Sequence, residues 1–536
     1  MTCTARFSRA PLAAALLAAA LAAPLPAWAA TAPGSGVAWV TAAADADIER
    51  AYAQARAEKK PLLLYWGAKW CPPCNQLKAT LFNRADFIDR SKSFVAVHVD
   101  GDLPGAQQLG ARFKVRGYPT MILLKPDGSE ITRLPGEVDA PQVLRVLQLG
   151  LAGGRPVKAV LADARAGKPV SGPEWRMLAY YGWDIDEAQL VAASERPALL
   201  AQLSRACPPA EREAATRLLL KALAESDDGK GIKPDAALRA QVTKLLADPR
   251  ATRAQMDVVV NAAPDITKAL APAPGPDRQA IAAAFDSALQ TLEADASLSR
   301  ADRLGALTSR VALARIDQPE KTLRPTLPDA LLQRLKAHVA RDDQQISDSY
   351  ERQAVITSGA YALGLAGLWA DSDALLKANL ARSHSPYYLM SQLGGNARKQ
   401  GEADEALRWY GLAFDKSEGP ATRLQWGASY LGALVDLAPQ DAPRIEQVAR
   451  TLFSEAGKDA AAFHERSARS LQRVADKLAG WNANGQQAAV LQRLHDGQNG
   501  QPGLAALCGR LDAVDAQRAT CEAIARALLK KPAAAG

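Results

Sequence analysis

The sequence predicts an α/β domain built on a mixed central sheet, followed by a much larger all-α region. Three observations carry this prediction. Helical and strand-like patterns alternate over residues 44–150, and a Cys-Pro-Pro-Cys motif directly follows one strand-like run. Beyond that range the chain is rich in Ala and Leu at helical spacing, with almost no strand-like run. A chain of 536 residues is also too long for one domain.

The composition is that of an ordinary globular protein, with 48% hydrophobic and 23% charged residues. The net charge of +8 comes from 65 basic and 57 acidic residues that are interspersed along the chain. Because no basic stripe with interleaved aromatic residues is present, we do not expect nucleic acid as a partner. No phosphate-binding or dinucleotide-binding glycine motif occurs, so we expect no cofactor.

The N-terminus has the pattern of a secretory signal peptide over residues 1–29. Arg6 and Arg9 precede a run of Ala and Leu, and an Ala-Trp-Ala cleavage site follows at 27–29. The run is shorter than the roughly 20 residues that a membrane span needs, and no later segment is long and apolar enough. We therefore expect an exported, periplasmic protein without a membrane span in its mature chain, and a linker over residues 30–43.

The first domain, expected over residues 44–150, has the element order α-β-α-β-α-β-β-α. Asp45 or Asp47 can cap the first helix and Asp139 the last, while Pro61 ends the first helix. A Lys-Pro-Asp-Gly turn signal at 125–128 joins two antiparallel strands. The expected helices are 45–60, 75–90, one that closes at 109–115, and 139–149, and the expected strands are 62–66, 94–100, 120–124 and 130–134.

The second part is expected to consist of a linker over 151–172 and an all-α region over 173–530. Short helical patterns with regular Pro- and Gly-rich breaks are typical of a helical array rather than of one bundle. One segment has the spacing of a tetratricopeptide repeat, with a turn at Gly401. The residues that carry this spacing are Leu393, Gly394, Ala406, Tyr410 and Ala413, with a weaker echo at Ala374 and Ala381.

The Cys71-Pro72-Pro73-Cys74 motif allows three interpretations. A zinc site needs two further soft ligands at matching spacing, whereas the other cysteines lie far away and the five histidines are scattered singly, so we expect no metal. A structural disulfide this tight restricts the unfolded chain little and stabilises the fold little. A redox-active pair is the interpretation that gives the neighbouring residues a role.

The redox interpretation follows from where the motif lies. A strand ending near Trp70 places Cys71 at the start of a helix, where unpaired N–H groups and the helix dipole favour a thiolate. Pro72 and Pro73 suit the first helical positions, and because they lack N–H groups the Cys74 N–H is the nearest donor to the Cys71 sulfur. Cys74, one turn into the helix, is expected to be more buried and to attack second.

Two stretches together, "LLLYWGAKWCPPC" and "FKVRGYPTMILLKPDG", resemble the thioredoxin family, and within it the periplasmic thioredoxin-like domain of thiol:disulfide interchange proteins. The resemblance covers about residues 44–150, a fifth of the chain. It implies that Cys71 is the nucleophile, Cys74 the resolving cysteine and Trp70 an aromatic packed beside them. It also implies that Pro119 is a cis-proline facing the redox-active Cys71–Cys74 disulfide, with the Tyr118 backbone offering a strand-like edge to a substrate.

The sequence departs from the family at one position. Many thioredoxins carry a buried acid on the strand before the motif, to take the proton of the resolving cysteine, and here that position is Tyr65. No Asp or Glu occurs between Pro61 and Lys78, so the route of this proton stays open. Lys69 and Lys78 either lower the pKa of a nearby thiol or are simply solvated.

The remaining cysteines have structural interpretations. Cys207 is expected in an inter-helix turn with a buried thiol. Cys508 and Cys521 either form a structural disulfide that staples a helical hairpin, worth roughly 3 kcal/mol in the chain-entropy model, or remain two free thiols. His98 alternates with apolar residues on a strand and is expected to have no catalytic role.

The function that we predict is that of an exported thiol:disulfide oxidoreductase that reduces protein disulfides through the Cys71–Cys74 pair. Its expected partners are protein disulfides, an unidentified electron-transfer partner and a protein bound to the helical region. The alternative is a non-enzymatic envelope scaffold in which the helical region is the working part. The enzyme hypothesis requires the Cys71 sulfur to be ionised and reachable near neutral pH.

Overall fold

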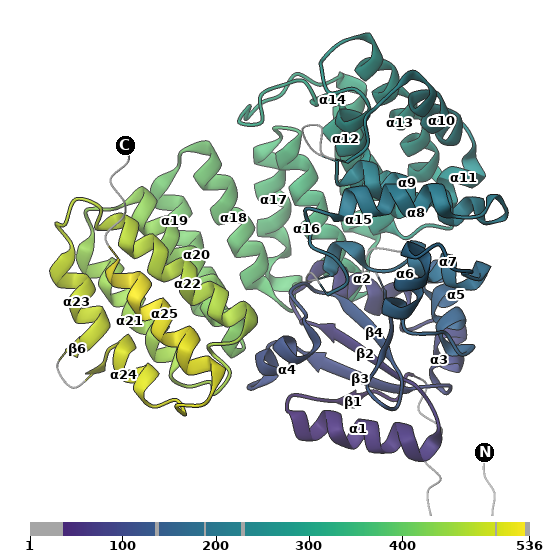
Figure 1. Ribbon diagram of the computed structural model, residues 1–536. Coiled ribbons are helices and arrows are strands. Elements are labelled where there is room, and N and C mark those ends of the chain that lie inside the picture. The colour runs from purple at the N-terminus through teal and green to yellow at the C-terminus, as the bar shows by residue number, and fades with distance from the viewer. Residues whose placement is uncertain (1–35, 135–138, 187–188, 227–230, 499–500, 531–536) are drawn as a thin grey trace, which may run out of the picture. The chain divides into compact units, whose positions relative to one another are not determined.

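The structure is a computed structural model that describes residues 36–134, 139–186, 189–226, 231–498 and 501–530 (Figure 1). The predicted signal peptide lies outside the described residues. The described residues belong to one compact unit that begins at Gly36.

A five-stranded sheet forms the centre of the first domain, with the strand order β1-β3-β2-β4-β5. The central strand β2 is parallel to β3 and antiparallel to β4, so that Leu64 lies opposite both Val97 and Ile122. Every residue of β2 is buried, as expected for a continuous apolar run. The strands are β1 (Val40–Thr41), β2 (Leu62–Gly67), β3 (Val95–Asp100), β4 (Thr120–Leu124) and β5 (Glu130–Leu134).

Helices cover both faces of this sheet, because successive side chains of each strand point to opposite sides. Leu62, Leu64 and Trp66 of β2 pack with α1 and α4, whereas Leu63 and Tyr65 pack with α2, α3 and α5. The predicted mixed sheet with helices on both sides is therefore confirmed. The helices are α1 (Asp45–Glu58), α2 (Pro72–Thr80), α3 (Ala85–Ser91), α4 (Ala106–Phe113) and α5 (Ala140–Leu151).

The helix expected over 75–90 is two helices, α2 and α3. The chain leaves the helical path after Thr80, and this break places Leu81 and Phe82 in the core against the sheet. Burial of these two side chains outweighs the preference of the segment for one continuous helix.

The segment expected as a linker over 151–172 differs from the prediction. It contains α6 (Val157–Arg165), whose Val157, Val160 and Leu161 are buried in the same core as Leu123 of β4. This core continues through α7 to α9. Val157, Val160 and Leu161 form an apolar stripe at helical spacing, and these helices bury it. Strand β1 likewise lies inside the linker expected over 30–43.

The rest of the described chain is almost entirely helical, which confirms the predicted large all-α region. One two-stranded hairpin, β6 (Gly497–Gln498) and β7 (Gln501–Pro502), interrupts it. The α-helices are α7 (Gly172–Ala179), α8 (Arg196–Ala206), α9 (Arg212–Ala224), α10 (Ala236–Leu246), α11 (Pro249–Ala254), α12 (Met256–Leu270), α13 (Pro276–Ala294), α14 (Arg300–Ala314), α15 (Asp329–Gln345), α16 (Ser349–Leu365), α17 (Trp369–Asn379), α18 (Pro386–Gln400), α19 (Ala403–Lys416), α20 (Pro420–Leu437), α21 (Ala442–Ala456), α22 (Glu465–Trp481), α23 (Ala488–Asp496), α24 (Leu504–Gly509) and α25 (Ala516–Leu529).

The segment with repeat-like spacing forms the helix pair α18 and α19. Gly401 ends α18 with a φ of 82°, a left-handed conformation that suits glycine. Gly394 allows close packing, since a side chain there would meet the Tyr410 ring at 3.0 Å. The small residues and the aromatic residue thus contact each other, while the assignment to tetratricopeptide repeats stays a prediction.

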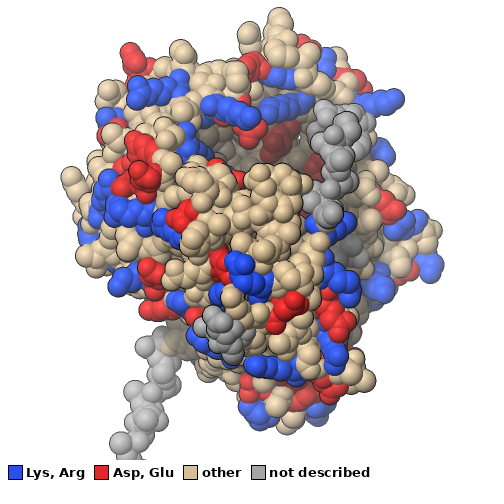
Figure 2. Space-filling view, turned by 90° about the vertical axis from the view of Figure 1, so that its left-hand side faces the viewer, with Lys and Arg blue, Asp and Glu red and all other residues tan. Residues whose placement is uncertain are grey.

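The C-terminal helices are joined by a disulfide between Cys508 of α24 and Cys521 of α25, with an S–S distance of 1.97 Å. Both cysteines lie in the core of this part of the molecule. No helix in the described ranges is both long and apolar enough to cross a bilayer. Basic and acidic side chains are interspersed over the face that Figure 2 shows.

Candidate redox site

The cysteine pair lies at the start of α2, just after the segment that connects β2 to this helix. Cys71 is the N-cap of α2 and is disulfide-bonded to Cys74, with a Cα–Cα distance of 5.2 Å. Pro72 and Pro73 fill the first helical positions, and the Cys74 N–H donates to the Cys71 Sγ at 3.3 Å. When the pair is reduced, this N–H and the positive end of the α2 dipole favour a thiolate on Cys71.

Two aromatic side chains flank the pair. Trp70 and Tyr118 both pack against Cys71 and Cys74, and their rings are 6.2 Å apart. The Tyr118–Pro119 peptide bond is cis, and Pro119 leads directly into β4 beside β2. The structure thus brings together Trp70, the Cys-Pro-Pro-Cys turn and Tyr118.

The cysteine pair is not open to solvent in this structure. Cys71 is 2% exposed and Cys74 is 0% exposed. The expectation of a reachable Cys71 sulfur is therefore wrong for this conformation. Its cover comes from the helical region, whose α16, α18, α20 and α22 supply residues that contact the turn and its surroundings.

Trp70, which packs against the pair, is surrounded by three polar side chains, and we call the four residues the Trp70 cluster: Trp70, Asp102, Thr422 and Arg466. The Trp70 indole N–H donates to Asp102 Oδ2 at 2.9 Å and to Thr422 Oγ1 at 2.8 Å. Arg466 forms an ion pair with Asp102, and its guanidinium lies 5.3 Å from the Trp70 ring centre. Trp70 is thereby held from both sides, by the sheet domain and by the helical region.

Further ring contacts extend this cover. Trp70 stacks on Tyr388 at 5.8 Å and meets Trp426 edge-on at 6.0 Å. Arg466 also lies 5.1 Å from the Tyr118 ring centre, and its backbone N–H donates to the Gln107 side chain. Sequence reasoning missed these residues, because no motif marks them.

Helix α2 is held along its length by the helical region. Gln76 Nε2 donates to Asp302 Oδ1 at 2.7 Å, and the Lys78 amine lies 5.2 Å from the Tyr350 ring centre. Burial lowers the pKa of Lys78. Lys69 forms an exposed ion pair with Glu418 at 3.1 Å, a contact of little energetic weight.

Tyr65 occupies the position where many thioredoxins have an acid, and it cannot accept a proton near neutral pH. Its side chain is 1% exposed, and its hydroxyl has no hydrogen-bond partner among the residues that the structure describes. Burial raises the pKa of Tyr65 far above its usual value. A group other than Tyr65 must therefore accept the proton of Cys74.

His98 lies beside Tyr65 and makes the stability of the fold pH-dependent. Its ring stacks on Tyr65 at 5.0 Å, and burial, followed by the nearby charge of Lys78, lowers its pKa from 6.5 to about 4. The unfolded chain takes up a proton at His98 in this window and the folded chain does not, so stability present above pH 6.5 is lost as the pH falls toward 4.

We therefore expect wild-type protein to lose about 2–3 kcal/mol more stability between pH 7 and pH 4.5 than His98→Gln, since one pKa unit corresponds to about 1.4 kcal/mol. Urea unfolding of both proteins at the two pH values measures this difference. Equal losses in both proteins would show that His98 is protonated as easily in the folded as in the unfolded chain.

Cys207 is a free thiol that ends α8 and is 7% exposed. Burial raises its pKa to about 11, and Glu211 adds to the effect. The Cys207 thiol is therefore protonated near neutral pH and is a poor nucleophile.

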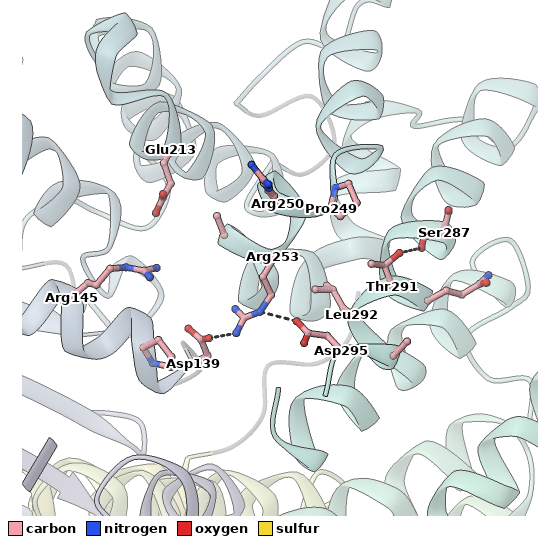
Figure 3. A pocket seen from close by; sticks show the side chains of 14 residues that line it. Asp139, Arg145, Glu213, Pro249, Arg250, Arg253, Ser287, Thr291, Leu292 and Asp295 are labelled. Carbon is pink, nitrogen blue, oxygen red and sulfur yellow. Dashed lines mark hydrogen bonds and ion pairs between the residues drawn. The ribbon is translucent and has the colours of Figure 1, made fainter. Parts of the chain in front are cut away.

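A large charged cavity lies elsewhere and does not touch the cysteine pair. It has a volume of about 1180 Å³ and lies between α5, α9, α11 and α13. Figure 3 shows Arg253 between Asp139 and Asp295, with ion pairs of 2.6 and 3.0 Å. Two of its three arginines, Arg145 and Arg250, have no ion pair with any described residue.

Comparison with known proteins covers the first domain. Residues 48–150 match the family model of the thioredoxin-like domain. The chain is 34% identical over 112 residues to the thiol:disulfide interchange protein DsbD of Pseudomonas fluorescens, which is 20% of this chain and 19% of that protein. The chain thus spans about a fifth of the length of the interchange proteins that it matches.

A shorter relative is covered over about three quarters of its length. The chain is 31% identical over 88 residues to thioredoxin of Mycolicibacterium smegmatis, which is 16% of this chain and 76% of that protein. A solved structure of a thioredoxin from Thermus thermophilus is 27% identical, with a TM-score of 0.19, covering 20% of this chain and 83% of the other. With its domain match, its coverage of three quarters of a thioredoxin and its Cys71–Cys74 pair at a helix start, this chain belongs to the thioredoxin family.

Proposed function

We propose that this protein is an exported thiol:disulfide oxidoreductase that reduces disulfides in other proteins. The observation that carries the proposal is the Cys71–Cys74 disulfide at the N-terminus of α2, within a domain of the thioredoxin family. The signal-like pattern in residues 1–29 and the similarity to interchange proteins support a periplasmic location.

The reaction begins with the reduced pair. The Cys71 thiolate attacks one sulfur of a substrate disulfide and forms a bond to it, the substrate S–S bond breaks, and the other substrate sulfur leaves as a thiolate that takes up a proton. Cys74 then loses its proton and attacks the Cys71 sulfur of the mixed disulfide. The second substrate sulfur leaves, so the substrate gains two electrons and two protons while Cys71 and Cys74 become a disulfide.

A complete cycle requires a dithiol donor that reduces the Cys71–Cys74 disulfide by the same exchange. The helix start holds the attacking sulfur, and the resemblance to thioredoxins implies that the Tyr118 backbone receives the substrate. In this account Trp70 and Tyr118 form the apolar surface around the reacting sulfurs.

One observation favours the scaffold hypothesis: Cys71 is only 2% exposed. Under that hypothesis the helical region is the working part and the cysteine pair takes no part in exchange. The two hypotheses differ in whether Cys71 becomes covalently linked to another protein.

The Cys74→Ala variant tests the proposal, because it lacks the sulfur that resolves a mixed disulfide. We expect reduced Cys74→Ala protein mixed with a periplasmic extract to form thiol-sensitive adducts through Cys71, and the Cys71→Ser, Cys74→Ala double variant to form none. Non-reducing electrophoresis followed by mass spectrometry measures the adducts. Equal adduct yields in the two variants would favour the scaffold.

A further inference from the structure

A cleft borders the Cys-Pro-Pro-Cys turn on the side where helices of the all-α region face it, and we call it the proline cleft. Its volume is about 520 Å³, within the usual range of ligand sites. Pro72 and Pro73 form one wall, and the other walls come from α12, α14, α16 and α18.

The lining of the proline cleft mixes apolar and polar side chains and is nearly uncharged. Among the described residues that line it, Asp265 is the one ionisable acid or base apart from tyrosines, and burial raises the pKa of that carboxyl. No Lys or Arg lines the cleft, in contrast to the three arginines of the cavity in Figure 3. The hydroxyl and amide groups in its walls belong to Asn261, Thr308, Ser309, Thr357, Ser358, Tyr361, Tyr388 and Gln392.

Two side chains in the walls are suited to hold a ligand. Tyr361 is 57% exposed, so its ring is available to pack against a bound segment, and tyrosine is a residue type enriched where binding energy concentrates. The Gln392 amide donates to the Thr357 carbonyl at 2.9 Å, while its own carbonyl oxygen is buried and meets no hydrogen-bond donor in the described part of the chain. A backbone N–H of a bound polypeptide would satisfy that oxygen.

The proline cleft is continuous with the redox site. Pro72 and Pro73 lie between the two cysteines in the chain, and Tyr388 both lines the cleft and stacks on Trp70. Trp70, which packs against the cysteine pair, is itself fixed by the contacts of the Trp70 cluster. A substrate that approaches the pair from the cleft therefore meets Pro72 and Pro73 first.

We propose that the proline cleft binds an uncharged segment of the protein substrate next to its disulfide, so that the helical region selects which disulfides reach Cys71. This inference rests on the proposed oxidoreductase function. The lining favours backbone amides and uncharged side chains, because it offers hydrogen-bonding groups and an exposed aromatic ring without a positive charge for phosphates or carboxylates.

The test compares a protein substrate with a small one that is too short to fill the cleft. The probes are insulin and bis(2-hydroxyethyl) disulfide, and the measured quantity is the ratio of kcat/KM for insulin to kcat/KM for the small disulfide. We expect this ratio to fall about tenfold in Tyr361→Ala, a typical loss for an aromatic contact at an interface, and to fall in Gln392→Ala as well.

Two controls make the result specific. Tyr361→Phe keeps the ring and is expected to keep most of the ratio. Leu323→Ala removes an apolar side chain that is 41% exposed outside the cleft, and is expected to leave the ratio unchanged. An unchanged ratio in both Tyr361→Ala and Gln392→Ala would overturn the assignment of the cleft, whereas a wild-type protein inactive on both probes would overturn the oxidoreductase function instead.

Discussion

Replacing Arg466 by Ala is expected to speed the alkylation of Cys71 in the reduced protein by at least about tenfold. Arg466 pairs with Asp102, lies over the Trp70 and Tyr118 rings, and is 8% exposed. Removing one partner of a buried ion pair costs about 3–5 kcal/mol, because the other charge is left uncompensated. We expect a large part of that cost to destabilise the closed state, in which the contacts of the Trp70 cluster are formed, relative to the open state.

The expected increase in the alkylation rate follows from the way in which a buried sulfur reacts. With Cys71 2% exposed, a reagent reaches it only when the cover opens locally, so the rate follows the population of the open state. A loss of about 1.4 kcal/mol in the closed state raises that population tenfold. Alkylation of reduced protein by iodoacetamide, followed by peptide mass spectrometry, measures the rate at Cys71.

Arg444→Ala is the matched control. Arg444 also combines a hydrogen bond and a ring contact, to Tyr430 at 2.8 and 5.5 Å, but it lies on α21 and contacts no residue of the Trp70 cluster in the described structure. We expect the control to alkylate at the wild-type rate. Equal rates in Arg466→Ala and Arg444→Ala, with both proteins folded, would show that the Trp70 cluster does not limit access to Cys71.

The sheet domain could be predicted from the sequence because its signals are local. The apolar run of β2, the Asp139 cap of α5 and the Lys-Pro-Asp-Gly turn each act within a few residues. The hydrogen bond from the Cys74 N–H to Cys71 likewise follows from two prolines that lack N–H groups.

The closed state of the site could not be predicted in the same way. Trp70 and Thr422 are separated by 352 residues. A periodic pattern predicts that a segment is helical, but it does not predict which surface that helix packs against. Gln76 and Asp302 are likewise 226 residues apart. The sequence of the sheet domain alone predicts an accessible Cys71, because it contains no signal for the helices that cover the site.

The linker over 151–172 was mispredicted for a different reason. Gly and Pro residues at its start indicate a linker, whereas the apolar stripe of Val157, Val160 and Leu161 that follows indicates a buried helix. Because that stripe completes the core beneath the sheet, it decides the structure of the segment.

Loss of the Cys71 sulfur is expected to have the largest effect of all on activity. The thiolate at this position is the only group in the proposed mechanism that attacks the substrate, and a serine hydroxyl does not form a mixed disulfide. Cys508→Ser removes a cysteine from the other disulfide, which lies in a separate core of the helical region, and serves as the control.

The central claim is tested most directly by the reduction of insulin with dithiothreitol in the presence of purified mature protein, followed by turbidity. We expect wild-type protein to accelerate reduction at least about tenfold over dithiothreitol alone, Cys508→Ser to retain that acceleration, and Cys71→Ser to show only the background rate. Equal rates for wild type and Cys71→Ser would contradict the account, since the buried pair would then take no part in thiol–disulfide exchange.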